Sequence, residues 1–286
     1  MRGVARCERP VSFGMPLIVS EAIVLHAFDY LESSRIVRLV TRDAGMRSGI
    51  AKGARKSRRR FGSGLDLFAQ GTAFLHTKPG RELDMLSGFE DVRTRTDLAS
   101  DLERFSGAET IAEIALYFGR EGADADLFDA IADAFDALTA QSTRDAREVT
   151  LGGAWRIVAT LGFGPAVNEC AECDSPIAAD QSALFSHSAG GVLCKRCASL
   201  NASGRKLPAA ARTAIASWMA GEHVAHFTDT AARAHQRLLR EFLLYHLHDG
   251  RPLRAFEFWE RGVWSDSTLA PPDPAVTSTS IGTTVG

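Results

Sequence analysis

Two Cys-x-x-Cys pairs lie close together in the second half of this 286-residue chain. The first pair is Cys170 and Cys173, the second is Cys194 and Cys197, and twenty residues separate them. Zn²⁺ prefers four soft or borderline ligands at the corners of a tetrahedron, and each such turn supplies two thiolates. The spacing therefore predicts one zinc ion, held by these four residues in a hairpin-containing module at 168–199.

A redox-active Cys-x-x-Cys and four independent buried thiols are the alternatives to zinc. A redox centre needs a single pair, so it leaves the second pair unexplained. Four cysteines close the tetrahedron around zinc and leave no position for an activated water, which indicates a structural site. Cys7 is expected to take no part in this site, and His187 within the module is interpreted as a surface or packing residue.

The composition favours an ordinary globular protein over a membrane or secreted one. Apolar residues make up 45% of the chain and charged residues 24%, which is typical of soluble domains. No apolar segment approaches the roughly 20 residues that a membrane span requires. The first residues contain arginines but no continuous apolar core, so they do not form a secretory signal. We expect a cytoplasmic protein, in which paired cysteines bind metal more often than they form disulfides.

The formal net charge of −2 conceals a strong asymmetry along the chain. Residues 15–95 hold fourteen Lys and Arg against nine Asp and Glu, whereas residues 97–148 hold four against thirteen. Residues 205–264 return to a positive balance, with nine basic and six acidic side chains. Two cationic segments therefore flank an anionic one.

The N-terminal part is typical of a small β-structure. Five short β-branched or alternating segments are separated by turn signals such as Lys78-Pro79-Gly80. The expected strands are LIVSEAIVLH, SRIVRLVT, MRSGIAK, TAFLHTK and RELDMLSGF. Five strands in about 75 residues favour a closed or partly open barrel over a sandwich.

Helical spacing replaces this pattern after Asp97. Helices are expected at about 101–119, 124–140, 148–161, 208–220 and 229–248. The apolar positions of the first two are Leu102, Phe105, Ile111, Ile114, Leu116 and Phe118, then Leu127, Phe128, Ile131, Phe135 and Leu138. We predict an α+β fold with a β-barrel over 15–95 and a helical domain over 97–264 that contains the zinc module. Residues 1–14 and the Pro/Ser/Thr-rich segment 265–286 are expected to be disordered.

The strongest candidate for a binding surface is the basic segment, residues 42–60, with eight basic residues and one acid. Small barrels bind single-stranded nucleic acid through a cationic groove with aromatic stacking platforms. The candidate DNA-binding residues are Arg35, Arg38, Arg42, Lys52, Arg55, Lys56, Arg58, Arg59 and Arg60. Phe61 and Phe68 either stack on bases or pack in the barrel core, and a merely solvated charged face is the alternative for the segment as a whole.

Four stretches of this sequence together resemble the RecO recombination-mediator family of bacterial DNA repair proteins. They are EAIVLHAFDYLESSRIVRLVTRDAGMRSGIAKGARKSRRRFGSGLDLF, LGFGPAVNECAECD, FSHSAGGVLCKRC and REFLLYHLHDGRPLRAFEFW. The resemblance covers nearly everything from Met15 to Trp264 and begins near Met15, so residues 1–14 are interpreted as an extension. The stretch RKSRRRFG carries more arginine than the family pattern requires, which leaves open what each arginine contacts.

The resemblance implies an N-terminal OB-fold, a helical C-terminal domain and a zinc module. It implies binding of single- and double-stranded DNA and annealing of complementary strands. It also implies cooperation with RecR to load RecA onto DNA coated with single-strand-binding protein, and association with the nucleoid during repair. We expect the acidic tail of single-strand-binding protein to dock on the helical domain, whose last segments carry Arg233, Arg237, Arg240, Arg251 and Arg254.

No catalytic motif emerges from the sequence. The chain lacks the P-loop pattern G-x-x-x-x-G-K-[ST], as well as H-E-x-x-H and G-x-S-x-G. The acidic helix contains Asp124, Asp126, Asp129, Asp133 and Asp136. Because their spacing lacks the EF-hand pattern, we interpret them as a solvated face and expect no enzyme. The alternatives are a magnesium-dependent nuclease that uses these aspartates, and a zinc-containing RNA-binding or protein-interaction module in transcription or translation.

Overall fold

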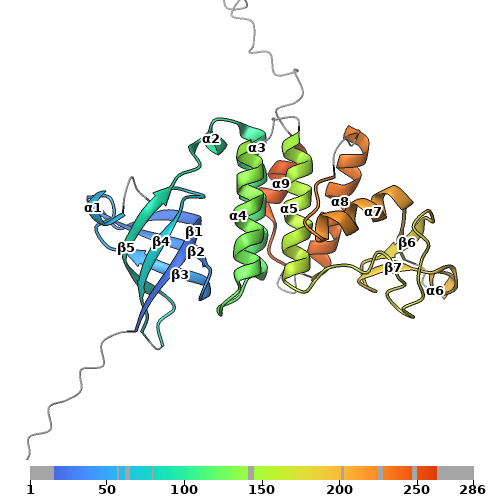
Figure 1. The fold of residues 1–286 in the computed structure, drawn as a ribbon, viewed down its shortest axis with the longest axis horizontal. Coiled ribbons are helices and arrows are strands. Elements are labelled where there is room, and N and C mark those ends of the chain that lie inside the picture. Colours follow the sequence, from blue (N-terminus) through green and yellow to red (C-terminus); the bar gives the residue numbers. More distant parts are fainter. Residues whose placement is uncertain are drawn as a thin grey trace, which may run out of the picture.

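The computed structural model places a β-barrel at one end of the molecule, a layer of helices in the middle and the cysteine module at the other end (Figure 1). It describes residues 16–56, 58–61, 65–78, 80–140, 145–200, 203–224, 228–246 and 250–262. The expected disordered segments, 1–14 and 265–286, lie outside these described residues.

The N-terminal part forms a closed five-stranded barrel, as the sequence predicts. Its strands are β1 (Leu17–Tyr30), β2 (Ser34–Thr41), β3 (Gly45–Ala51), β4 (Gln70–His76) and β5 (Asp84–Arg93). They are joined in the order β1-β2-β3-β5-β4, and β4 pairs with β1 to close the barrel. The β3–β5 pair is parallel and the other pairs are antiparallel. This Greek-key closure is the OB-fold.

Alternating residues of the strands fill the barrel, because successive side chains point to opposite faces. Val24 of β1, Val37 of β2 and Phe89 of β5 are among the buried residues of this core. The short helix α1 (Arg58–Phe61) covers one end of the barrel and contributes Phe61, which is 1% exposed. Phe61 is therefore a core residue and offers no platform for a base.

Five helices match the predicted ones: α3 (Leu102–Phe118), α4 (Ala125–Ala140), α5 (Ala146–Thr160), α7 (Ala209–Met219) and α8 (Asp229–His246). The sequence does not predict the short helices α2 (Thr96–Ala99) and α9 (Arg254–Arg261). All five apolar positions predicted for α4 are buried. In α3, Leu102 is instead exposed, and Gly107 and Ala108 are buried. None of the described helices is long and apolar enough to cross a membrane.

The C-terminal half of the chain also contains a small three-stranded sheet. Strands β6 (Ala183–Ser186) and β7 (Gly191–Leu193) form the predicted hairpin, and β8 (Arg205–Leu207) pairs with the other edge of β6. Gly190 has a positive φ of 75° in the hairpin turn, a conformation that glycine adopts without steric strain. Helix α6 (Lys195–Leu200) follows β7 directly.

The barrel and the helices share a hydrophobic contact. Ile23 and Val40 on the outer face of the barrel belong to the same buried cluster as the helical core. Phe68 joins this cluster as well, with its ring centroid 4.9 Å from that of Phe135 and 5.8 Å from that of Phe105. Phe68 therefore packs in the interface between the two domains. Its ring is buried there and offers no platform for base stacking.

Candidate metal centre and nucleic-acid interface

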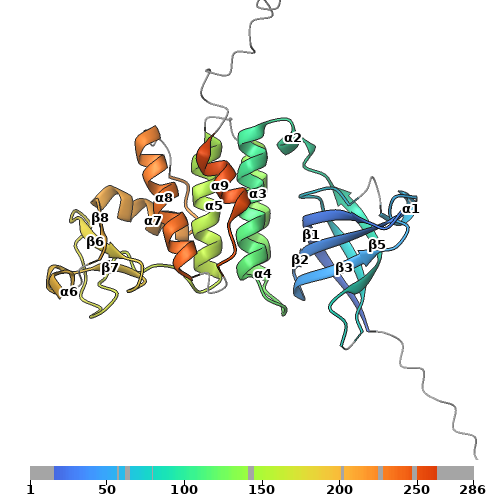
Figure 2. The same ribbon diagram turned by 180° about the vertical axis from the view of Figure 1, so that it is seen from behind.

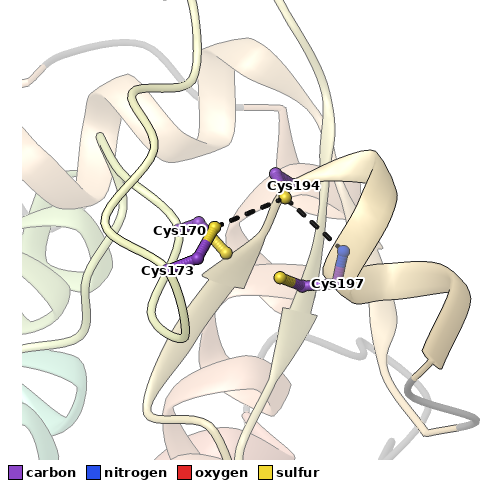
Figure 3. A group of neighbouring side chains, drawn as sticks. All are labelled: Cys170, Cys173, Cys194 and Cys197. Atoms are coloured by element: carbon purple, nitrogen blue, oxygen red, sulfur yellow. Dashed lines mark hydrogen bonds between the residues drawn. The ribbon is translucent and has the colours of Figure 1, made fainter.

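The four cysteines of the two pairs come together in the structure. Cys170 and Cys173 lie in the turn that precedes β6, Cys194 follows β7, and Cys197 lies in α6. Their sulfur atoms all lie within 4.8 Å of one another. Figure 3 shows the four side chains converging from the turn on one side and from the end of β7 and the start of α6 on the other.

The sulfur positions fit a tetrahedral metal ion. A Zn–S distance of about 2.3 Å in a regular tetrahedron places the sulfur atoms about 3.8 Å apart. The Sγ atoms of Cys173 and Cys194 are 3.8 Å apart. The backbone N–H of Cys197 also donates a hydrogen bond to Cys194 Sγ over 3.5 Å. The arrangement can therefore hold a metal ion with four thiolates, which leaves no coordination position open for a substrate or an activated water.

The protonation of the cluster is that expected of a site that can accept a cation. A hydrogen bond from the Ser175 hydroxyl is the largest of the contacts that lower the pKa of Cys173 to about 6. The hydrogen bond with Cys173 and burial together raise the pKa of Cys197 to about 12. One thiolate is thus stabilised while a neighbouring thiol keeps its proton, because several negative charges in this space repel one another. A bound cation removes that repulsion and lets all four sulfur atoms ligate as thiolates.

Arg212 of α7 fixes the cysteine module to the helical domain. Its side chain is 2% exposed. Its Nε donates to the carbonyl of Val167 over 2.7 Å, and its Nη atoms donate to the carbonyls of Ile177, Ala178 and Gln181. One buried guanidinium therefore orders both ends of the loop that carries Cys170 and Cys173. The sequence contains no signal for this role, since the four acceptors are backbone oxygens.

His187 lies apart from the sulfur atoms, on the side of the hairpin that faces α8. Its ring packs against Phe185 and Phe242, with centroid distances of 5.3 and 6.4 Å. Its Nε2 lies 3.3 Å from a carboxylate oxygen of Glu241. These contacts are those of a packing residue.

On the side of the barrel that faces the helices, arginines are held by carboxylates. We call Arg42, Arg47, Arg93 and Arg95 the interface arginines. Arg42 donates to both carboxylate oxygens of Asp129 over 3.1 and 2.7 Å, and its Nε lies 3.1 Å from Glu21. These contacts raise the pKa of Arg42, with the hydrogen bond to Asp129 as the largest cause. The sequence predicts that Arg42 contacts DNA, whereas in the structure three of its five N–H donors are engaged by Glu21 and Asp129.

Arg93 and Arg95 converge on one aspartate of α4. Both Nη atoms of Arg93 lie 2.9 Å from the Asp136 carboxylate, and Arg95 Nε lies 2.8 Å from it. The Arg95 side chain is 1% exposed and also donates to the carbonyl of Phe68 and to Gln70. Ion pairs with arginines thus engage Asp129 and Asp136, which the sequence pattern assigns to a solvated face. That interpretation is wrong because the partners come from another domain.

Two of the three remaining aspartates of the acidic helix also have partners. Asp133 pairs with Arg156 of α5 over 2.8 Å. Asp124 accepts the backbone N–H of Leu127 over 2.9 Å at the start of α4, as an N-cap residue does. These carboxylates therefore form no cluster among the described residues that could hold a metal ion.

The far side of the barrel carries cations that are exposed to solvent. We call Lys52, Arg55, Lys56 and Arg60 the outer cations, and all four are exposed. They lie in the loop after β3 and in α1, at the end of the barrel farthest from the helices in both views (Figures 1 and 2). Arg58 and Arg59 belong to α1 as well, but their side chains lie outside the described part of the chain.

The arginines among the outer cations contact their own loop and the turn beside it. Arg55 lies 3.7 Å from Asp29 and donates to the carbonyl of Glu32 over 3.4 Å. Arg60 donates to the carbonyl of Lys52 over 3.2 Å, and its guanidinium lies 5.4 Å from the centre of the Phe61 ring. These contacts position the loop and leave the outer cations accessible to solvent.

The two candidate arginines of β2 point to opposite faces of the strand, because they are three positions apart. Arg35 lies on the face of Val37, pairs with Asp29 over 3.3 Å and donates to the carbonyl of Leu65 over 3.0 Å. Arg38 is exposed on the outer face and lines a cavity between the barrel and the helices. These two candidate DNA-binding residues therefore do not share one face of β2.

Phe28 and Tyr30 of β1 are exposed aromatic residues that sequence reasoning does not single out. They are 43% and 41% exposed, whereas the two phenylalanines considered from the sequence are buried. The signal is the alternation of aromatic rings at the end of the first strand. This alternation does not stand out in the sequence, because an ordinary half-buried strand shows the same pattern.

Known proteins match this chain in sequence along nearly all of its described residues. Residues 15–95 match the family model described as "Recombination protein O N terminal", and residues 99–255 match "Recombination protein O C terminal". The chain is 35% identical over 245 residues to the DNA repair protein RecO of Anaeromyxobacter sp. (strain K), which covers 82% of this chain and 93% of that relative. It is 33% identical over 186 residues to the DNA repair protein RecO of Rubrobacter xylanophilus, which covers 65% and 73% of the two chains. A barrel, a helical domain and a four-cysteine cluster in this order, together with these matches, show that the chain belongs to the RecO family of DNA repair proteins.

Proposed function

We propose that this protein is a recombination mediator that binds single- and double-stranded DNA and anneals complementary strands. Together with RecR it promotes the loading of RecA onto DNA coated with single-strand-binding protein, in association with the nucleoid. It performs no catalytic step of its own. The observation that carries the proposal is the set of outer cations, which are exposed on the OB-fold at the end of the barrel away from the acidic helix.

The outer cations act mainly on phosphates. They lie in a loop and a one-turn helix, and this helix is too short to enter a DNA groove and read bases. Phosphate contacts position a protein on DNA but carry little sequence information. Binding is therefore similar for strands of mixed sequence, and it weakens with salt because counterions are released.

The cysteine cluster binds one structural zinc ion. The support for zinc is the closed set of four sulfur ligands and the 3.8 Å separation of Cys173 and Cys194. Zinc in this site holds the turn that carries the first pair against the start of α6. It acts on stability and leaves the barrel surface unchanged.

The helical domain docks the acidic tail of single-strand-binding protein. Of the five arginines expected to serve this purpose, Arg240 pairs with Glu260 over 3.2 Å. Arg233 and Arg237 are exposed on α8, and Arg251 and Arg254 are exposed beside the barrel. Titrating a labelled tail peptide against the full chain at low salt tests this docking. Saturable binding supports it, and the absence of binding contradicts it.

Strand annealing tests the proposed function most directly. Complementary DNA strands coated with single-strand-binding protein should anneal faster when this protein is added, and RecA filaments should form faster only when RecR is also present. Magnesium-dependent cleavage of the strands would instead indicate a nuclease. Stronger binding to RNA than to single-stranded DNA of equal length would favour the RNA-binding module.

A further inference from the structure

A cleft separates the barrel from part of the helical domain. It has a volume of about 450 Å³. The barrel contributes His26 of β1 and Arg38 of β2 to its wall, and the chain around the start of α9 contributes Arg251 and Arg254. We call this space, which the side chains of α3 also line, the interdomain cleft.

The cationic wall of the interdomain cleft is fixed in place by α3. The Tyr117 hydroxyl donates to the carbonyl of Pro252 over 3.1 Å. The Glu113 carboxylate accepts the backbone N–H groups of Ala255 and Phe256 over 3.1 and 3.0 Å. These bonds hold the segment that carries Arg251 and Arg254 against α3. The start of α9 is thereby already capped and offers no anion site of its own.

Three arginines and two glutamates line the cleft, so its formal charge is +1. Arg38 and Arg251 line the same cleft, and burial followed by repulsion from Arg251 lowers the pKa of Arg38. Glu113 is occupied by the backbone of α9, and burial raises the pKa of Glu109, which makes its carboxylate easier to protonate. An anion with several oxygens would relieve the repulsion between the arginines, and a phosphate matches the geometry of paired guanidinium groups.

A strip of aromatic side chains leads from this cleft along β1. His26, Phe28 and Tyr30 alternate on the strand and therefore share its outer face. The register pairs His26 with Arg38 and Tyr30 with Ser34, so the strip begins at the wall of the cleft. It ends beside the outer cations, because the N–H of Arg55 donates to the carbonyl of Ser33 in the turn after Tyr30.

We propose that a single DNA strand follows this path from the outer cations, across Phe28 and Tyr30, into the interdomain cleft. Its bases stack on the two rings, and its phosphates lie between Arg38, Arg251 and Arg254. This inference rests on the proposed DNA-binding function and adds a base-stacking site and a contribution from the helical domain. A duplex keeps its bases paired and cannot stack them on the rings, so the path distinguishes single from double strands.

An acidic peptide is the competing occupant of the cleft, since carboxylates also pair with arginine. With DNA in the cleft, the acidic tail proposed to dock on the helical domain relies on Arg233 and Arg237 rather than on Arg251 and Arg254. A DNA strand is the favoured occupant because the surface is continuous. It joins exposed cations, exposed rings and a cleft with three arginines along β1. A peptide that binds only to the arginines does not account for the exposed rings of Phe28 and Tyr30 next to the cleft.

The first test removes the rings. We expect the full chain with Phe28→Ala and Tyr30→Ala to bind labelled oligothymidine at least about tenfold more weakly than wild type, because each stacked base contributes measurably to affinity. Its affinity for a duplex should change by less than about twofold. The matched control is Leu17→Ala with Val19→Ala, at exposed positions near the other end of β1, which should leave both affinities unchanged. Phe28→Trp should retain binding of the single strand, which separates lost stacking from misfolding.

The second test removes charge from the cleft. Arg251→Ala with Arg254→Ala should weaken oligothymidine binding and flatten the slope of log K against log salt by about 0.7 for each phosphate that is no longer neutralised. Arg205→Ala with Lys206→Ala, at exposed positions on β8, should leave the slope unchanged.

Two outcomes would overturn the inference. Unchanged oligothymidine binding in the ring and cleft variants, with wild type still binding, would place the strand elsewhere and leave the proposed function intact. Loss of binding to an acidic peptide by the cleft variant, with DNA binding unchanged, would assign the cleft to a peptide. A wild-type chain that binds no DNA would instead contradict the proposed function itself.

Discussion

The two sides of the barrel both carry basic side chains but use them differently. On the side that faces the helices, the interface arginines pair with carboxylates at 2.7 to 2.9 Å: Arg42 with Asp129, Arg93 and Arg95 with Asp136, and Arg47 with Glu121. On the far side, the outer cations are exposed, and Arg55 lies 3.7 Å from the carboxylate of Asp29. Arg42 and Arg60 belong to the same basic segment, yet one joins two domains and the other faces solvent.

This difference shows that a count of charges along a sequence does not separate structural from binding arginines. The anionic balance of residues 97–148 is explained in part by the interface, because aspartates of α4 neutralise cations of the barrel. A cation that already has a carboxylate partner gains less from a phosphate, since the partner must first be released. The available surface is therefore smaller than the basic segment and lies at its C-terminal end.

The largest effect on stability is expected from the metal site, which belongs to neither side of the barrel. Cys194→Ser replaces a thiolate by a poor zinc ligand and should lower the free energy of unfolding of the helical domain by at least about 4 kcal/mol. DNA affinity should change little, because the outer cations lie at the other end of the molecule. Elemental analysis and calorimetry measure the two quantities. Cys7→Ser is the control and should keep one zinc ion per chain, whereas wild-type protein purified without chelator and lacking metal would refute the site.

The second-largest effect on stability is expected within the interface, where a buried arginine and an exposed arginine bind the same aspartate. Arg95→Ala removes a buried guanidinium and leaves the Phe68 carbonyl and the Gln70 side-chain oxygen without this donor, while Asp136 keeps only Arg93, which should cost about 3 kcal/mol in urea unfolding. Arg93 binds the same aspartate but is 58% exposed, so Arg93→Ala should cost less than about 1 kcal/mol. Equal losses in the two variants would show that burial of Arg95 contributes nothing to the interface.

Acid offers a way to weaken the helical domain while the outer cations stay charged. Burial lowers the pKa of His235 to about 4, against about 6.5 for an exposed histidine. Between these values the unfolded chain binds a proton that the folded chain does not. The contribution of neutral His235 to the free energy of unfolding is therefore complete above pH 6.5 and is lost as the pH falls toward 4.

The pH dependence is isolated by comparing wild type with His235→Phe, which keeps an aromatic ring beside Trp218. Relative to His235→Phe, wild type should lose about 2 to 3 kcal/mol of unfolding free energy when the pH falls from 7 to 4. A difference that does not change with pH would mean that His235 is not held neutral in the folded state.

The sequence predicts the parts of this molecule that depend on local pattern. Alternating β-branched residues locate the five barrel strands, and paired cysteines locate the cluster that can hold a metal. The apolar face of α4 is also predicted, because Leu127, Phe128 and Phe135 repeat at helical spacing. Each of these signals lies within a short stretch of the chain.

The features that sequence reasoning misses depend on contacts between distant residues. Arg42 and Asp129 are separated by 87 positions, so nothing local distinguishes this arginine from Lys52. Phe61 and Phe68 sit in two different cores, which a pattern of aromatic residues beside a basic segment does not reveal. Helix α9 has eight residues, too few for a periodic signal. The position of Arg251 and Arg254 opposite β2 follows only from the packing of α9 against α3.

The smallest effect on stability, and the most direct test of the difference between the two sides, comes from the outer cations. Lys52→Ala, Arg55→Ala and Lys56→Ala together should change the free energy of unfolding by less than about 0.5 kcal/mol, as exposed substitutions do. The matched variant on the interface side is Arg42→Ala, which should lower stability by about 1 kcal/mol.

The deciding measurement is the slope of log K against log salt for oligothymidine binding in these two variants and in wild type. If each of the three outer cations neutralises one phosphate, the triple variant should flatten the slope by roughly 2 units. The Arg42→Ala slope should match that of wild type. A triple variant with the wild-type slope, or an Arg42→Ala variant that flattens it as much as the triple, would contradict the assignment of DNA binding to the far side of the barrel.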